Sequence, residues 1–477
     1  MYRGARVRTG DLVVPNDARY QAAPRPDGQR SYLAAVLRER RTDSGAGDGR
    51  LHVALYARLR VADVQPFRAL RYDLGRGEAL ADLTAPPYDV LDAGQRAALL
   101  ERSPHNVVAI DLPDGEPDPY AQAASTFAQW QRDGVLVRDE EPALWAHAQE
   151  YTGPDGRPRT RHGIFARVRV EDYGPGRIRA HERTHPGPKE DRLRLTRATK
   201  ANLSPIFALY DDPAGAAWSA VAAAAADRPD GETTDPEGTR HTFHRIADPE
   251  SIATVRAVLA DAELLIADGH HRYETARVYA EEIGGEGPHS FVLMCLVALQ
   301  DPGLTILPSH RLVRGLGPTR QEALAATLRE RFAIEEIEAD RLRPPDGDGP
   351  LELGYIDAHF KRAFRLTLTD PHAADGLLAP ALRGLDTAVL EALILKGPLG
   401  LSDNDISHLN GLGYARTDAE ALELVESGAY DAGFFMRPSP VAQVREIAAA
   451  GETMPPKSTF FYPKLLTGLL FNPLDSD

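Results

Sequence analysis

The most constraining feature of this sequence is a short apolar strand that leads directly into a glycine turn and then a helix. Residues 263–267 have the length and composition of a buried strand, and residues 273–283 have helical spacing. Such a junction brings backbone N–H groups and the positive end of a helix to one point, which favours an anion. Because Gly269 lies in the turn and lets the backbone approach a ligand closely, the sequence predicts an anion-binding site there.

The side chains of this turn strengthen the prediction. Arg272 supplies a planar fork suited to phosphate or carboxylate, and His270 and His271 supply donors or proton carriers. The alternative is an ordinary capped helix start with surface charges. Metal binding through two adjacent histidines is disfavoured, because neighbouring side chains on a turn point apart.

Composition limits the class of protein. A chain of 477 residues has material for about two to four domains. The single cysteine, Cys295, excludes an internal disulfide and cysteine-based zinc or iron–sulfur modules, and its apolar surroundings predict a buried, inert thiol. The net charge of −15 argues against bulk binding to nucleic acid or anionic membranes, but allows a local basic pocket.

We expect a soluble, cytoplasmic protein, because no signal peptide and no apolar run of about 18–20 residues is present. The predicted organisation is a poorly ordered extension (1–50), a catalytic, nucleotide-binding α+β domain (51–299) and a mixed α/β C-terminal domain (300–477). The predicted strands are 51–56, 67–72, 106–112, 144–151, 162–170, 206–210, 263–267, 291–299, 352–355, 364–368 and 430–436. The predicted helices are 119–133, 216–226, 253–261, 273–283, 321–332, 385–395 and 441–450.

A second charged segment, residues 178–192, is predicted to be a structured loop because it contains two prolines and a glycine. A carboxylate beside cations can stay ionised and act as a base while the cations hold phosphate, although a solvated charged loop is the alternative. The candidates here are His181, Glu182, Arg183, Thr184, Lys189 and Arg192. The segment also spells His-Glu-x-x-His through His185, but that zinc pattern requires a helix, which we do not expect here.

Two further segments carry weaker signals. Residues 199–205, with Asn202 and Ser204, form either an ordinary turn or a polar rim to the same site. Lys457 and Lys464 flank an aromatic strand near the C-terminus, which is either a core strand with exposed lysines or part of a block that closes the site. Neither a Gly-x-Ser-x-Gly elbow nor a P-loop pattern is present, so a serine hydrolase and a P-loop nucleotide fold are disfavoured.

Taken together, the motifs ADGHHRYETA, APPYDVL, NVVAIDLP, HERTHPGPKEDRL, NLSPIFALY and MPPKSTFFYPKLLTGL resemble the bacterial and archaeal family called domain of unknown function 1015. The resemblance runs from about Val64 to the C-terminus. The turn from Asp268 to Arg272 also resembles the phosphate-binding turn of the ParB/sulfiredoxin-like superfamily, which includes nucleotide-dependent free serine kinases.

This second resemblance implies a small α+β catalytic module, ATP or ADP as phosphoryl donor, Mg²⁺, and the hydroxyl of a free amino acid as acceptor. In such a kinase Glu182 is our candidate base, with His181 and His270 beside it. The phosphate or nucleotide would be held by Asp268, Gly269, His270, His271 and Arg272, with Asp268 also a candidate metal ligand. The acceptor would meet Arg183, Thr184, Lys189, Arg192, Asn202, Ser204 and Lys457.

Three functions remain open at this stage. The first is a kinase for free serine or a related hydroxy amino acid. The second is a ParB-like nucleotide-binding regulator without turnover, and the third is a phosphohydrolase. The expected partners are a small amino acid and a nucleotide, without nucleic acid or membrane, and a homodimer is compatible with the sequence.

Overall fold

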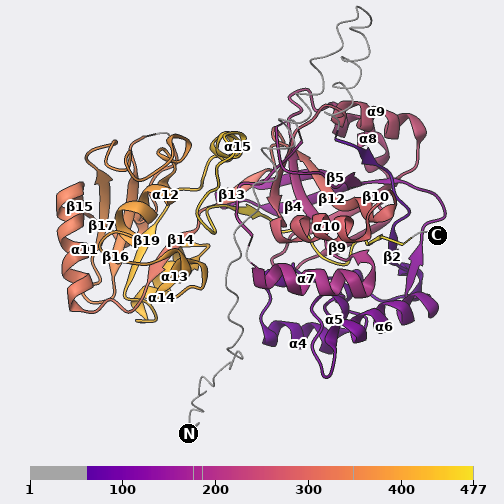
Figure 1. Cartoon of the computed structure of the whole chain (residues 1–477), viewed down its shortest axis with the longest axis horizontal. Helices are drawn as coiled ribbons and strands as arrows, with labels where there is room; N and C mark the ends of the chain where they lie inside the picture. Colours follow the sequence, from indigo (N-terminus) through magenta and orange to yellow (C-terminus); the bar gives the residue numbers. More distant parts are fainter. Residues whose placement is uncertain (1–61, 176, 185, 348, 476–477) are drawn as a thin grey trace, which may run out of the picture. The chain divides into compact units, whose positions relative to one another are not determined.

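The computed structural model describes residues 62–475 apart from 176, 185 and 348. The predicted N-terminal extension, the predicted strand over 51–56 and His185 lie outside this described part. Within it, strands and helices mix in two large sheets and several small ones, which confirms the predicted mixed α/β class (Figure 1). No helix of the described residues is long and apolar enough to cross a bilayer.

The first large sheet is nine-stranded. Its order is β6-β11-β8-β12-β5-β4-β10-β9, and β1 pairs with β5. Its strands are β1 (Val64–Gln65), β4 (Leu144–Thr152), β5 (Pro158–Arg169), β6 (Ile178–Arg179), β8 (Ile206–Tyr210), β9 (Gly231–Thr234), β10 (Arg240–Ile246), β11 (Leu264–Asp268) and β12 (Phe291–Ala298). The predicted hairpin is the antiparallel pair β4–β5, with Trp145 opposite Phe165.

The second large sheet is six-stranded, with the order β15-β17-β16-β19-β14-β18. Its strands are β14 (His310–Val313), β15 (Phe332–Ile337), β16 (Glu352–Asp357), β17 (Ala363–Leu368), β18 (Leu412–Ala415) and β19 (Ala432–Phe435). Three small pairs complete the strands: β2 (Leu70–Tyr72) with β3 (Leu136–Arg138), β7 (Ala201–Asn202) with β21 (Asn472–Pro473), and β13 (Thr305–Leu307) with β20 (Phe460–Tyr462).

The described helices have the following bounds. The α-helices are α3 (Leu80–Leu83), α4 (Ala93–Arg102), α5 (Val108–Asp111), α6 (Pro119–Arg132), α7 (Pro186–Thr199), α8 (Ala216–Ala225), α9 (Pro249–Leu259), α10 (His270–Ile283), α11 (Pro318–Arg331), α12 (Asp386–Leu390), α13 (Asp403–Ser407), α14 (Asp418–Glu426) and α15 (Val441–Ala449). A π-helical turn (Glu391–Leu395) continues α12. Short 3₁₀ turns are Leu74–Arg76, Tyr88–Val90, Pro288–Ser290, Ala339–Arg341 and Pro380–Leu382.

Two predicted elements are wrong. The predicted strand over 106–112 is instead the short helix α5, because the Asn106 side chain accepts a hydrogen bond from the backbone N–H of Val108 (3.1 Å) and caps a turn. The predicted loop over 178–192 is wrong at both ends, because β6 covers 178–179 and helix α7 begins at Pro186; residues 180–184 between them have no regular structure. The prolines and the glycine of this segment fall in the first turn of α7, where a proline costs no helical hydrogen bond.

The central strand β12 explains how the first sheet is buried on both faces. Leu293, Cys295 and Val297 face one hydrophobic core, and Met294 and Leu296 face the other. This alternation follows from the two-residue period of a strand. Helices α8, α9 and α10 contribute side chains to the second core, among them Tyr273 of α10. The anion-turn helix is therefore fixed to the sheet.

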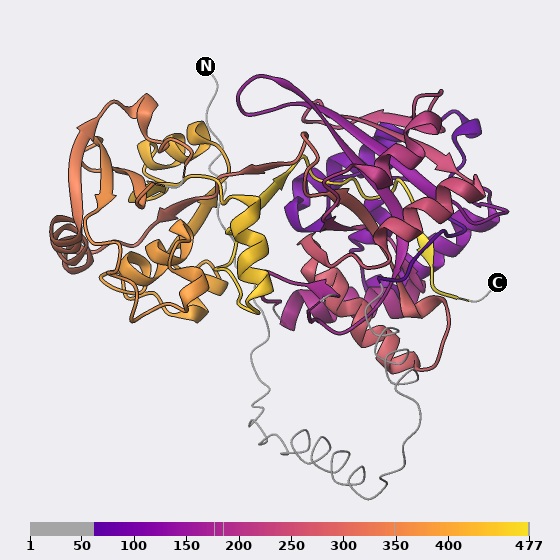
Figure 2. The ribbon, with the colours of Figure 1, turned by 90° about the horizontal axis from the view of Figure 1, so that it is seen from above.

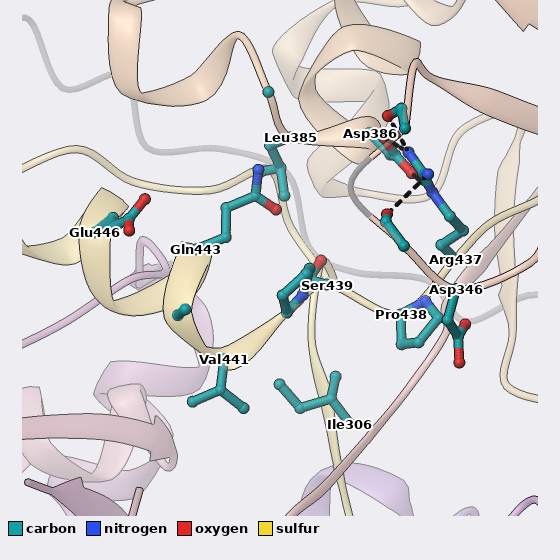
Figure 3. Close-up of a pocket in the computed structure, with 15 residues that line it drawn as sticks. Ile306, Asp346, Leu385, Asp386, Arg437, Pro438, Ser439, Val441, Gln443 and Glu446 are labelled. Carbon is teal, nitrogen blue, oxygen red and sulfur yellow. Dashed lines mark hydrogen bonds and ion pairs between the residues drawn. The ribbon is translucent and has the colours of Figure 1, made fainter.

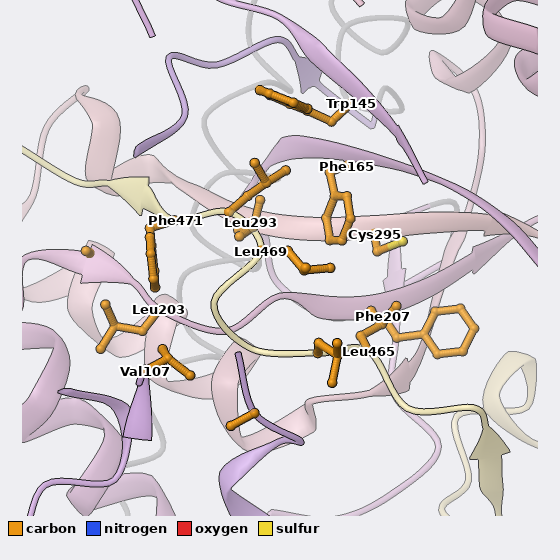
Figure 4. Packing of buried hydrophobic residues seen from close by; sticks show 14 of the residues in the cluster. Val107, Trp145, Phe165, Leu203, Phe207, Leu293, Cys295, Leu465, Leu469 and Phe471 are labelled. Carbon is orange, nitrogen blue, oxygen red and sulfur yellow. The ribbon is translucent and has the colours of Figure 1, made fainter. Parts of the chain in front are cut away.

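The first core is completed by the end of the chain. We call residues 454–473 the C-terminal strap; it can be followed in yellow from α15 toward the C-terminus (Figure 2). Its residues Leu465, Leu469 and Phe471 pack in the same cluster as Phe165 and Leu293 (Figure 4). The predicted division at 299/300 stays a prediction, but the strap contributes to the core of the first sheet.

Gly163 on β5 gives a test of this packing. A Cβ at this position would lie 2.6 Å from the Sγ of Cys295. We expect Gly163→Ala to lower the free energy of unfolding by about 1–3 kcal/mol through overpacking. Chemical denaturation measures this, and the cost should shrink in a Cys295→Ala background because the sulfur is gone. Gly376→Ala, at an exposed position where the Cβ would meet nothing within 4 Å, is the control; equal costs at positions 163 and 376 would contradict the packing.

Candidate functional site

The strand–turn–helix junction forms as the sequence predicts. Strand β11 ends at Asp268, Gly269 adopts a left-handed conformation (φ 94°), and α10 begins at His270. No side chain caps this helix end. The first N–H groups of an α-helix also have no acceptor within the helix. The guanidinium of Arg272 lies over Gly269, where an added Cβ would meet Nε at 3.0 Å. A glycine is therefore required by both conformation and space.

Asp268 is the centre of the charges at this junction. Its Oδ1 accepts a hydrogen bond from the N–H of Gly269 (2.9 Å), and its Oδ2 lies 3.1 Å from the Nζ of Lys464 and 3.7 Å from Arg272. Burial acts to raise the pKa of this carboxyl, but Lys464 and Arg272 outweigh burial and hold the pKa well below its usual range. Asp268 is therefore ionised at neutral pH.

The two histidines predicted as catalytic are both buried. His181 uses both ring nitrogens: Nδ1 donates to the carbonyl of Ile266 (2.9 Å), and Nε2 accepts from the hydroxyl of Thr459 (2.9 Å). Burial lowers the pKa of His181 to about 4. With both nitrogens bonded, His181 is a neutral ring of fixed tautomer that holds β11 to the strap.

The ring of His270 lies edge-on to that of His181, with centroids 4.6 Å apart. Burial, together with His181, lowers the pKa of His270 well below its ordinary value. Its Nε2 is buried and has no hydrogen-bond partner within the part of the chain that the structure describes. A buried polar atom without a partner is costly, so this nitrogen is a binding atom left for a ligand or a water.

Glu182 follows His181 and is partly buried. Burial raises the pKa of its carboxyl, and this effect is opposed by Lys457 and, more weakly, by Lys464. Lys457, a residue in the left-handed conformation (φ 56°), also lowers the pKa of this carboxyl through its backbone. The negative charge of Glu182 acts in turn on buried Arg311. Glu182 thus lies among the strap, the α10 turn and the second sheet.

Four other predicted residues are bonded to protein groups. Lys189 lies 3.3 Å from Glu274 of α10. Arg192 donates to the carbonyl of Asp111 (2.6 Å), and Ser204 donates to the carboxylate of Asp111 (3.1 Å). Asn202 accepts from the N–H of Leu293 and from the amide of Asn472. Their predicted role in binding substrate stays a prediction; in the structure they join α7, β7 and the strap.

Arg192, Asn202, Ser204 and Arg272 line one small cavity of about 40 Å³, which has room for a few waters only. Arg183 does not line this small cavity. Its Nε donates to the hydroxyl of Thr453 (3.0 Å), and it lines a separate cavity of about 480 Å³. Thr184 is partly buried beside it in sequence, His271 is partly buried on the first turn of α10, and Lys457 is exposed.

Asp268 is the candidate metal ligand, and the His-Glu-x-x-His pattern is the disfavoured zinc alternative. The described residues contain no group of three or more His, Cys, Asp or Glu that could hold a metal ion. His181 and Glu182 precede α7 and do not share a helix face, so the zinc pattern lacks its required geometry. Asp268, the candidate metal ligand, is held by two cations. These residues do not fit a dedicated Mg²⁺ site.

A larger cavity of about 690 Å³ lies between Arg437 and helix α15 (Figure 3). Its charged centre is Arg437, which makes a two-pronged ion pair with Asp386 at 2.8 and 2.9 Å. Gln443 and Glu446 of α15 also line it. None of the predicted site residues reaches this cavity, and its one described arginine is already neutralised by Asp386.

Some residues of the site escaped prediction from the sequence. In the sequence Lys464 is only a cation beside an aromatic strand, and no local pattern links it to Asp268. Arg161 anchors the strap through the carbonyls of Tyr462 and Pro463, but in the sequence it is one of several arginines of β5 and nothing local distinguishes it. Arg311 and Asp111 gave no signal beyond being charged residues next to apolar stretches.

The fold and the junction define a mixed α/β protein with an anion-type turn at a helix N-terminus. The chain belongs to the family described as protein of unknown function (DUF1015), whose model matches residues 64–388. This confirms the family predicted from the motifs, although the matched residues end before the strap. No curated protein sequence matches the chain.

Three solved structures that resemble the chain show how distant such likenesses are. A free serine kinase variant in complex with AMP has 12% identity and a TM-score of 0.34, covering 64% of this chain and 92% of that chain. A conserved hypothetical protein from Pyrococcus furiosus has 14% identity and a TM-score of 0.33, covering 64% and 95%. SbnI from Staphylococcus aureus, truncated at its C-terminus, has 12% identity and a TM-score of 0.32, covering 64% and 85%. Likenesses of this degree carry no argument for a shared activity.

The depressed pKa of His181 predicts a pH dependence of stability. The unfolded chain takes up this proton near pH 6.5 and the folded chain only near pH 4, so the contribution of His181 is complete above pH 6.5 and is lost as pH falls toward 4. We expect His181→Gln to flatten the pH dependence of the free energy of unfolding in this window by up to about 3 kcal/mol. Denaturant titrations at pH 7, 5.5 and 4 measure this, and parallel curves for both proteins would contradict it.

Proposed function

We propose that this protein is a nucleotide-dependent phosphotransferase that acts on the hydroxyl of a small acceptor, of which free serine or a related hydroxy amino acid is the first candidate. The observation that carries the proposal is the charge arrangement around the start of α10. Two carboxylates, Glu182 and Asp268, lie among three cations: Arg272 of α10, and Lys457 and Lys464 of the strap. The surplus of positive charge suits a phosphoanion.

Phosphoryl transfer depends mostly on positioning and on stabilising negative charge, and the site has groups for both. The first N–H groups of α10, which have no acceptor within the helix, would hold phosphate oxygens together with Arg272. The partnerless Nε2 of His270 offers a further contact at the same place. His181 does not move protons in this scheme, because both of its ring nitrogens are bonded; it fixes the position of the neighbouring Glu182.

Glu182 would act as the base that accepts the proton of the acceptor hydroxyl. Its raised pKa suits this role better than that of an ordinary surface carboxylate, because a base works best when its pKa lies near the working pH. The lowered pKa of Asp268 suits the opposite role, a permanently ionised partner for cations. The different surroundings of the two carboxyls therefore suit Glu182 to act as the base and Asp268 to pair with cations.

We place the acceptor in the cavity of about 480 Å³ that begins at Arg183, the residue after Glu182. Its volume lies in the range of small-molecule sites. Met454, Pro455 and Pro456 of the strap form part of its apolar wall, and the ion-paired Lys396, Glu391 and Asp403 also line it. Arg183 would meet the acceptor's carboxylate. Mg²⁺ has no fitted site among the described residues, so no step is assigned to it.

Substitutions of Glu182 and of Arg272 test the proposal. With ATP or ADP and a panel of free amino acids, mass spectrometry should detect a phosphorylated amino acid with the wild-type protein. Glu182→Gln should lower its rate of formation by about 10²–10⁴-fold, because the base is lost. Arg272→Lys should weaken nucleotide binding by about tenfold or more, because the planar fork is lost.

Two matched controls accompany these variants. Glu171 also has a carboxyl whose pKa burial raises, and Arg277 lies on the same helix as Arg272 but pairs with Glu274 and Asp172. Glu171→Gln and Arg277→Lys should retain activity. Wild-type turnover by Glu182→Gln would refute the assigned base. Nucleotide binding without any phosphorylated product would favour the ParB-like regulator, and phosphate release without an acceptor would favour a phosphohydrolase.

A further inference from the structure

The C-terminal strap brings a cation into the proposed phosphate site from outside the family-matched residues. Lys464 lies 76 positions beyond residue 388, where the family match ends. Its Nζ is 3.1 Å from Oδ2 of Asp268 and 4.4 Å from the ring centre of Phe460. The side chains of Lys464 and Asp268 are each only 20% exposed. A charge in such surroundings is kept only where it has partners.

The backbone around Lys464 is fixed by the first sheet. The carbonyl of Lys464 accepts from the side chain of Gln149 on β4 (2.9 Å). Arg161 on β5 donates to the carbonyl of Tyr462 (3.2 Å) and to that of Pro463. The guanidinium of buried Arg161 thus donates hydrogen bonds both to the strap and to Gln149. This anchoring holds the lysine in place beside the start of α10, so little order has to be gained on binding.

Asp268 occupies the place that an anion would take. Its carboxylate bonds the N–H of Gly269 at the helix start, and it pairs with both Lys464 and Arg272. These are the groups that a phosphate at a helix N-terminus also needs: an N–H group, and cations beside it. Asp268 therefore keeps the buried cations partnered while no ligand is bound.

We infer that Lys464 is a phosphate-binding residue of this site, with its ammonium shared between Asp268 and a terminal phosphate of the bound nucleotide. The inference rests on the proposed function and adds to it a residue from the strap. Arg416 supplies a matched comparison, because it also lies over the ring of Phe460 (4.4 Å) but is exposed. Lys464 differs from Arg416 in facing Asp268.

Calorimetric titration with ADP, inorganic pyrophosphate and adenosine tests this inference. Lys464→Met should weaken the binding of ADP and of pyrophosphate by about 10- to 100-fold, the value of one charge-assisted contact. The affinity for adenosine, which has no phosphate, should not change. Lys464→Arg should retain most of the phosphate affinity, and Arg416→Met should bind like the wild type.

A second variant covers the case in which Lys464→Met leaves Asp268 as an unpaired buried charge and fails to fold. The double variant Asp268→Asn with Lys464→Met removes both charges, and it should bind ADP about 10- to 100-fold more weakly than Asp268→Asn alone. Wild-type ADP affinity in Lys464→Met, or equal ADP affinity of the double variant and Asp268→Asn, would overturn the role of Lys464 alone. A wild-type protein that binds neither ADP nor pyrophosphate would overturn the proposed function as well.

Discussion

The ion pair between Asp268 and Lys464 is the interaction on which the site depends, because it joins residues 196 positions apart at the start of one helix. Strand β11 delivers the carboxylate, Gly269 turns the chain, and the strap delivers the ammonium. Without the carboxylate, Lys464 and Arg272 would be two neighbouring cations with little solvent around them. Without the lysine, Asp268 would lose the strongest of the cations that hold its pKa below its usual range against the effect of burial.

The same pair explains why the end of the chain is built into the first core. Leu465, Leu469 and Phe471 bury apolar surface against the sheet, and Arg161 bonds the strap carbonyls just before Lys464. The hydrophobic contacts supply the stability, while the polar contacts set the position of the lysine to within hydrogen-bonding distance. In the strap, the residues that pack in the core thus lie next to the lysine that faces Asp268.

Local signals predicted the junction well and the contacts across it poorly. The strand over 263–267 and the helix from 273 match β11 and α10 closely, because an apolar run, a glycine and helical spacing are all properties of adjacent residues. Helix α5 was missed because one side chain, Asn106, determines the turn, and the start of α7 was missed because its prolines suggest a loop. The partners of Arg192 and Lys464 depend on tertiary packing, which no local pattern contains.

A crystal structure of the protein with ADP tests the central claim most directly. The proposal predicts the β-phosphate at the start of α10, with its oxygens within hydrogen-bonding distance of the backbone N–H groups of residues 270–272 and of the Nζ of Lys464. It further predicts that the carboxylate of Glu182 faces an open position beside that phosphate. A nucleotide bound elsewhere, such as in the cavity at Arg437, with the Asp268–Lys464 pair untouched, would contradict it.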